Sequence, residues 1–166
     1  MKRKDVILLF FVVAIVLFMV WAQSGLRAAG HGALKVTVKY MGAGTVDQQH
    51  QIYVLLTDSN PFTSSKLVDA TLPGSAPETG VARILSIQGT GTKDGTITFS
   101  NVAVSPVYAV AFYDKNGSYN GHLDSLPPGS PLGLFGKPPD KLEPIKVEEG
   151  NGSKITLAFD DSTKTP

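Results

Sequence analysis

The chain has 166 residues, with 15 basic and 14 acidic side chains and no cysteine. Its length suits one domain with a substantial core, and the lack of cysteine excludes a thiol nucleophile, a disulfide framework and a cysteine-linked lipid anchor. Residues 1–29 hold four basic residues and one acid, so 11 basic and 13 acidic residues remain, a net charge of −2. This balance argues against nucleic acid as a partner, because such binders usually carry a clustered basic face.

The N-terminus has the pattern of an export segment. Lys2, Arg3 and Lys4 precede an unbroken apolar run of 17 residues, Val6–Ala22. This order is typical of a signal peptide, and the run also reaches the lower limit for a membrane-spanning helix. We therefore expect residues 1–22 to be either a cleaved signal peptide or a retained signal anchor, with the membrane as a partner through residues 6–22 in the second case. Both interpretations place the rest outside the cytoplasm, periplasmic, secreted or anchored to the inner membrane.

Residues 23–33 are rich in Gly, Ala and Ser and predict a flexible tether. Beyond it, Leu34–Lys39 alternates apolar and polar side chains, which predicts a half-buried strand. Gln51–Asp58 is largely apolar and predicts a buried strand. Further strands are predicted, in chain order, at 66–72, 81–88, 96–99, 101–104, 142–148 and 154–159. Turn residues at Thr92–Gly95 and Gly150–Ser153 predict two hairpins.

The stretch Val107–Asp124 holds the best core strand. Both faces of its first seven residues, VYAVAFY, are largely apolar, which predicts a strand buried on both sides at the centre of a sheet. Seven or eight short strands with no helix after residue 23 predict an all-β fold. We expect a single antiparallel β-sandwich of transthyretin-like or immunoglobulin-like type over residues 34–160, followed by a frayed tail at 161–166.

The segment TITFSNVAVSPVYAVAFYDKNG resembles the strand–turn–strand unit of carboxypeptidase regulatory-like, transthyretin-like domains, with Ser105-Pro106 where Pro-Gly is commoner. The residues that carry this likeness are Thr98, Phe99, Val102, Tyr108 and Val110. The loop that follows resembles one in small uncharacterised secreted bacterial sandwich proteins, through Asp114, Asn116, Gly121, Leu123 and Asp124. The resemblance implies an accessory, binding or structural domain outside the cytoplasm, and it offers no catalytic residues to carry over to this sequence.

The loop Asp114–Asp124 is a candidate calcium site. It places oxygen-bearing side chains at nearly alternate positions: Asp114, Asn116, Ser118, Asn120 and Asp124. Calcium takes six to eight hard oxygen ligands, and glycine-punctuated Asp/Asn loops supply them. The EF-hand spacing fails, since Tyr119 and Ser125 stand where Gly and Glu are needed. The alternative is that these side chains form successive turns by bonding to their own backbone.

Other site chemistry has weaker support. His31, His50 and His122 lack the short spacing of metal ligands. A small hydrolase would need Asp58, Asp114, Asp124 and His122 to meet in one cleft. No Gly-x-Ser-x-Gly context is present.

Ser125–Pro139 is rich in Pro and Gly but carries apolar residues, namely Leu126, Leu132, Leu134 and Phe135. Exposed, these residues would form a partner surface; buried, they would cap one end of the fold. We expect an exported, non-catalytic module with a binding or structural role, and with a protein-contact region at Asp114–Pro139. A calcium-stabilised sandwich and a small extracytoplasmic hydrolase are the alternatives.

Overall fold

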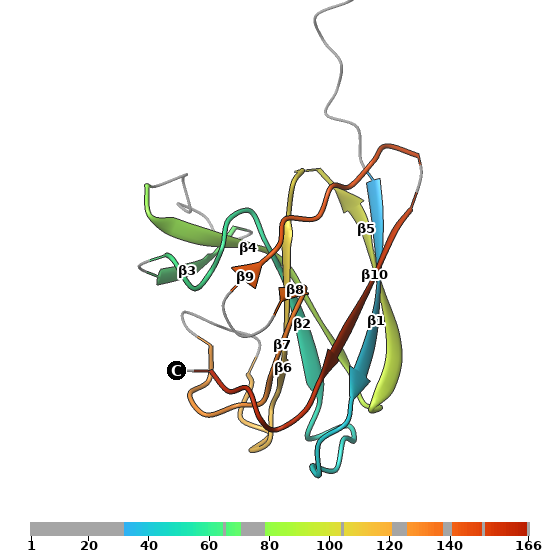
Figure 1. The fold of residues 1–166 in the computed structure, drawn as a ribbon, viewed down its shortest axis with the longest axis vertical. Coiled ribbons are helices and arrows are strands. Elements are labelled where there is room, and N and C mark those ends of the chain that lie inside the picture. Colours follow the sequence, from blue (N-terminus) through green and yellow to red (C-terminus); the bar gives the residue numbers. More distant parts are fainter. Residues whose placement is uncertain are drawn as a thin grey trace, which may run out of the picture. The chain divides into compact units, whose positions relative to one another are not determined.

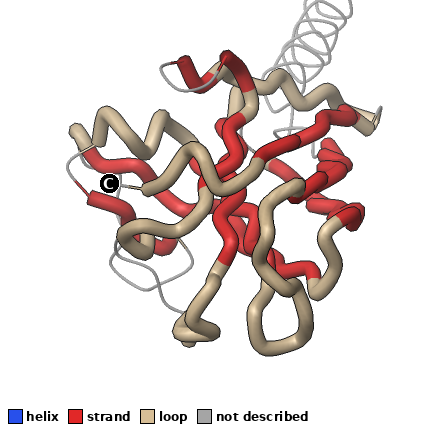
Figure 2. The backbone as a smooth tube through the Cα atoms, turned by 60° about the horizontal axis from the view of Figure 1, so that its bottom comes forward, coloured by secondary structure: helices blue, strands red, loops and turns tan. Residues whose placement is uncertain are grey.

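All regular elements in the described part of the chain are β-strands. The computed structural model describes residues 32–64, 66–70, 79–103, 105–120, 126–137, 141–150 and 152–165. The predicted export segment and all of the tether except residues 32–33 lie outside these ranges. Figure 2 shows only strands and loops among the described residues. None of these residues belongs to a helix that is long and apolar enough to span a membrane.

Three strands form one sheet in the order β10-β1-β5. They are β1 (Gly32–Tyr40), β5 (Asp94–Val102) and β10 (Ser153–Phe159). Strand β1 is hydrogen-bonded to both of the others, and the three strands cross one another in the view of Figure 1. Strand β1 is antiparallel to β5 and parallel to β10. Its side chains alternate between buried and more exposed positions, which confirms the half-buried strand predicted there.

Five strands form the second sheet in the order β3-β4-β2-β6-β7. They are β2 (Ile52–Thr57), β3 (Lys66–Asp69), β4 (Val81–Thr90), β6 (Tyr108–Tyr113) and β7 (Leu132–Leu134). The short strands β8 (Gly136–Lys137) and β9 (Lys141–Leu142) pair with each other. The predicted buried strands at 51–58 and 107–113 correspond to β2 and β6, which are neighbours at the middle of this sheet.

One hydrophobic core receives side chains from both sheets. The three-stranded sheet contributes residues such as Val36, Phe99 and Leu157, and the five-stranded sheet contributes Val54 and Ala111. These side chains are the inward set of each alternating strand, so the period of two in the sequence determines which residues meet.

The other face of the five-stranded sheet is also covered. Val110 of β6 packs with Leu132, Leu134 and Leu142, and Phe112 packs in a second cluster with residues of β2, β3 and β4. Strand β6 is therefore buried on both sides, as its two apolar faces predict. The described part of the Pro-rich segment caps this face, because Leu132 and Leu134 are buried.

The prediction of a purely antiparallel fold was wrong, because both sheets are mixed. Strand β1 runs parallel to β10, and β3 runs parallel to β4. Only a tight hairpin forces two neighbouring strands to be antiparallel. Nearly the whole described chain separates β1 from β10, so no turn determines their relative direction.

The two predicted hairpins were also wrong. The turn at residues 91–93 joins β4 to β5, but these strands belong to different sheets. Strand β10 pairs with β1 along seven residues rather than with the segment before it. In that segment, the predicted strand at 142–148 is reduced to Leu142 in β9 and an isolated bridge from Ile145 to Val107. Turn residues specify a change of direction, whereas the pairing partner depends on which strand edge is open.

Candidate functional site

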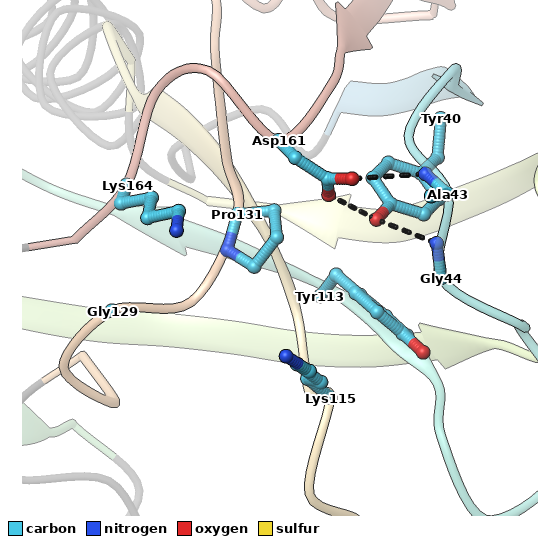
Figure 3. Close-up of a pocket in the computed structure, with 9 residues that line it drawn as sticks. All are labelled: Tyr40, Ala43, Gly44, Tyr113, Lys115, Gly129, Pro131, Asp161 and Lys164. Carbon is cyan, nitrogen blue, oxygen red and sulfur yellow. Dashed lines mark hydrogen bonds between the residues drawn. The ribbon is translucent and has the colours of Figure 1, made fainter.

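A pocket of about 370 Å³ lies where β1, β6 and β10 end. Tyr40 is the last residue of β1, Tyr113 is the last residue of β6, and Asp161 follows β10 by two residues. Figure 3 shows these three side chains together with Lys115 and Lys164. The remaining lining residues are Ala43, Gly44, Gly129 and Pro131.

Tyr40 is the centre of a hydrogen-bonded group on one side of the pocket. Its side chain is only 4% exposed, and its hydroxyl donates a short hydrogen bond to Oδ1 of Asp161. The same hydroxyl accepts a hydrogen bond from the Gly44 amide at 3.3 Å. Burial, and then the hydrogen bond to Asp161, raises the pKa of Tyr40 well above its ordinary value. Tyr40 is therefore a neutral donor at physiological pH.

Asp161 joins the chain after β10 to the loop after β1. Its Oδ2 accepts a hydrogen bond from the Ala43 amide at 2.9 Å. The Tyr40 hydroxyl, then the Ala43 amide, and then the charges of Lys164 and Lys115 lower the pKa of Asp161. The carboxylate is therefore ionised and has its hydrogen-bonding partners within the protein.

Tyr113 provides the aromatic wall beside Tyr40. The two ring centroids are 5.0 Å apart, and the Tyr113 hydroxyl donates to the Thr45 carbonyl at 2.7 Å. The pKa of Tyr113 is raised, first by burial and then by the nearby carboxylates of Asp47, Asp161 and Asp114. Both tyrosine hydroxyls thus hold the loop at residues 42–45, and their rings face the pocket.

Lys115 and Lys164 supply positive charge to the other side. Both side chains are exposed, and Figure 3 shows them extending toward the space beside Pro131. In the described part of the chain, no ion pair joins either ammonium group to a carboxylate. The arrangement combines two aromatic rings with two ammonium groups that remain available to an anionic group of a ligand.

Residues 161–165, which the sequence predicts as part of a frayed tail, include Lys164 and are hydrogen-bonded to the segment around Ser130. Thr165 is 4% exposed, and its amide donates to the Ser130 carbonyl at 2.9 Å. The Leu132 amide donates to the Thr163 carbonyl at 2.9 Å, and Lys164 forms an isolated bridge with Pro131. The tail extends the edge beside β7, where main-chain groups were open to pairing.

The predicted calcium loop folds around the carboxylate of Asp114. This residue is 2% exposed, and its oxygens accept hydrogen bonds from the Ser118 amide at 3.1 Å, the Ser118 hydroxyl at 3.3 Å and the Tyr119 amide at 2.8 Å. Asn116 and Asn120 are exposed, and Asp124 lies outside the described residues. The local bonds are those expected of a turn-forming Asp. Calcium binding stays a prediction, which melting with calcium and then chelator would test.

The residues of the hydrolase hypothesis do not all come together. Asp58 directly follows β2, whereas the Asp114 amide donates a hydrogen bond to the carbonyl of Gln51, which directly precedes β2. A strand of six residues spans about 20 Å, so the two carboxylates lie at opposite ends of the sheet. His122 and Asp124 are outside the described ranges.

The candidate histidine site also lacks structural support in the described ranges. Nδ1 of His50 is hydrogen-bonded to Oδ1 of Asp47 at 3.0 Å, and His31 and His122 lie outside the described residues. Among the described residues, no group of three or more His, Asp or Glu side chains is arranged to hold a metal ion.

Sequence reasoning missed Tyr40, Asp161 and Lys164 as site residues. Tyr40 directly follows the predicted strand Leu34–Lys39, and Asp161 and Lys164 lie in the predicted tail at 161–166. One signal in the sequence could have indicated this site. Tyr40, Tyr113 and Asp161 each lie at the end of a predicted strand or within two residues of it.

Comparison with known proteins gives no relative: no family model, no curated protein and no solved structure matches the chain. The resemblance to carboxypeptidase regulatory-like, transthyretin-like domains and to small secreted bacterial sandwich proteins therefore stays a prediction.

Proposed function

We propose that this chain is an exported β-sandwich module, of transthyretin-like or immunoglobulin-like type, that acts by binding an anionic ligand. The basic and apolar pattern of residues 1–22 supports export, as a cleaved signal or a retained anchor. The core shared by the two sheets supports the sandwich arrangement. The module would act in the periplasm or at the cell surface.

The observation that carries the binding role is the pair of lysines beside the two tyrosine rings. Lys115 and Lys164 present ammonium groups to a pocket whose one carboxylate, Asp161, is already bonded to Tyr40 and Ala43. An entering carboxylate would meet these two positive charges against the single negative charge of Asp161, so positive charge is in excess. The rings of Tyr40 and Tyr113 would contact the apolar part of the same ligand. A volume of about 370 Å³ suits a small organic acid or the end of a larger acidic molecule.

The protonation states of the pocket favour binding over catalysis. A general acid or base works best when its pKa lies near the working pH. Here the pKa of Tyr40 is raised and that of Asp161 is lowered, so both shifts move the pKa further from pH 7. Each group instead stabilises the wall of the pocket through its hydrogen bonds to the other and to the loop at Ala43 and Gly44.

The test is calorimetric titration of the full-length chain, in neutral detergent micelles, with N-acetylphenylalanine and with its neutral amide. We expect the carboxylate to bind at least about tenfold more tightly than the amide, which corresponds to about 1.4 kcal/mol. The double variant Lys115→Gln/Lys164→Gln should lose this preference.

The matched control is Lys141→Gln, which removes an exposed lysine of β9 that does not line the pocket. It should leave the preference for the carboxylate unchanged. Equal binding of acid and amide, or no binding of either, would contradict the proposed role of the pocket.

Export is tested separately by fusing the C-terminus to a reporter enzyme that is active only outside the cytoplasm. We expect activity with the intact N-terminus and none after Val6–Ala22 is deleted. Equal reporter activity in both fusions would show that this segment does not direct export.

A further inference from the structure

The outer face of the three-stranded sheet is a flat array of lysine and threonine side chains. The inward residues of β1, β5 and β10 enter the core, and the alternate residues face solvent. In the rows where residues 35–39 of β1 are in register with both neighbours, the outward set is Lys35, Thr37, Lys39, Asp94, Thr96, Thr98, Lys154, Thr156 and Ala158. We call this set the lysine–threonine face. No described segment covers it, since all its members except the partly buried Thr37 are exposed.

The strand register arranges these residues in rows across the sheet. Lys154 of β10 is the direct partner of Lys35 of β1, whose partner on β5 is Thr98. Two residues further along β1, the next row on the same face consists of Thr156, Thr37 and Thr96. Hydroxyl groups thus form a continuous line across all three strands, beside a line that contains two ammonium groups.

The Lys35–Lys154 pair opposes stability. Like charges directly opposite on neighbouring strands repel, and neighbouring strands lie about 4.8 Å apart. No ion pair links Lys35, Lys39 or Lys154 to a carboxylate of the described residues. Asp94, opposite Lys39, is the one acid in the set. The excess positive charge is therefore available to an external anion.

We propose that the lysine–threonine face binds an anionic polysaccharide that carries carboxylate groups. Lys35 and Lys39 lie four residues apart on one strand, a separation of about 13 Å, so the face presents positive charge at intervals along a linear polymer. The threonine hydroxyls would bond to the sugar hydroxyls between the carboxylates. This binding would occur at a different surface from the tyrosine pocket and does not depend on it.

Two other polyanions fit the face less well. A membrane-surface site usually inserts large apolar side chains, but the only apolar member here is Ala158. The exposed large apolar residues among those described are Met41 and Phe62, and neither belongs to the face. Single-stranded nucleic acid is usually bound by aromatic stacking, and no aromatic residue is in the set.

The experiment measures binding of the full-length chain, in neutral detergent micelles, to polygalacturonate, a linear glycan with one carboxylate per sugar. Neutral dextran, anionic phosphatidylglycerol vesicles and single-stranded DNA are measured in parallel. We expect polygalacturonate to bind most tightly, with an affinity that falls as the salt concentration rises, because exposed charges are screened over about 8 Å at physiological ionic strength. Equal or tighter binding to vesicles or DNA would overturn the proposal.

The variants separate charge from hydroxyl recognition. Lys35→Gln/Lys154→Gln should weaken binding at least tenfold, and Thr37→Val/Thr156→Val should weaken it severalfold while keeping the β-branched shape and the charge. The control Lys141→Gln, which removes an exposed lysine that belongs neither to this face nor to the pocket, should bind as the unaltered chain does. Unchanged binding by both variants of the face would refute the proposal, whatever the result at the pocket.

Discussion

The two sheets differ in how many of their faces are buried. The middle strands of the five-stranded sheet have apolar contacts on both sides, through the main core and through the clusters around Phe112 and Val110. The three-stranded sheet buries one face and leaves lysines and threonines on the other. This difference separates two roles. Both faces of the five-stranded sheet contribute apolar contacts that stabilise the fold, whereas the exposed face of the three-stranded sheet can contact a ligand.

The largest expected effect is on the doubly buried sheet. Phe112→Ala removes a fully buried ring of β6 and should lower the free energy of unfolding by about 3–5 kcal/mol. Thr98→Ala, on the exposed face of β5, should change it by less than about 0.5 kcal/mol. Urea unfolding of both variants measures the difference. Similar losses in the two variants would show that the outer face of the five-stranded sheet is not a second core.

A smaller effect is expected where the sheets end at the pocket. Tyr40→Phe removes the hydroxyl donor to Asp161 and should lower the free energy of unfolding by about 1–2 kcal/mol, since the carboxylate keeps only the Ala43 amide of its two partners. The control Asp94→Asn changes an exposed carboxylate of the three-stranded sheet and should cost less than about 0.5 kcal/mol. If the two substitutions had the same effect, the Tyr40–Asp161 hydrogen bond would not hold the C-terminal segment in place.

The same pair predicts a pH dependence with two limbs. The pKa of Asp161 is lowered from its ordinary 3.8, so its stabilisation is present above that pH and is lost as pH falls through the folded-state pKa. The pKa of Tyr40 is raised from its ordinary 10.0, so its stabilisation is present below pH 10.0 and is lost as pH rises toward the folded-state pKa. Urea midpoints measured across the pH range should show Asp161→Asn reducing the acid limb and Tyr40→Phe reducing the alkaline limb. If the two variants lost stability at acid and at alkaline pH as the unaltered chain does, other groups would be responsible for the pH dependence.

The smallest effect has the opposite sign. Lys154→Gln removes the like-charge pair with Lys35 and should stabilise the chain by about 0.2–1 kcal/mol at low salt. The gain should shrink as salt is added, because the charges are exposed. A loss of stability at low salt would indicate that Lys154 is stabilising its own sheet, contrary to the role inferred for this face.

Much of the fold was predictable because local patterns determine it. The alternation in Leu34–Lys39 and the two apolar faces of Val107–Tyr113 gave the strands and their burial correctly. Pairing was not predictable from the same patterns. Strand β10 has an alternating sequence that suits any open edge, and it pairs in parallel with β1 rather than in a hairpin.

The candidate site was predicted only in part. The loop at Asp114 was recognised by its turn residues, and its local hydrogen bonds follow from them. The pocket joins Tyr40, Tyr113 and Asp161, which are far apart in sequence, and no local pattern marks them as neighbours. The polar, terminal residues 161–166 predict a frayed tail, and no local pattern predicts that the Thr165 amide donates a hydrogen bond to the Ser130 carbonyl.

The most direct test of the account is an NMR titration of the ¹⁵N-labelled full-length chain, in neutral detergent micelles, with N-acetylphenylalanine. The proposed binding module predicts shifts that saturate and centre on the amides of Lys115, Tyr113 and Lys164, with the residues of β3 and β4 unaffected. Shifts confined to a region away from the pocket, or none at saturating ligand, would contradict the proposal that this chain functions by capturing an acidic ligand between its tyrosines and lysines.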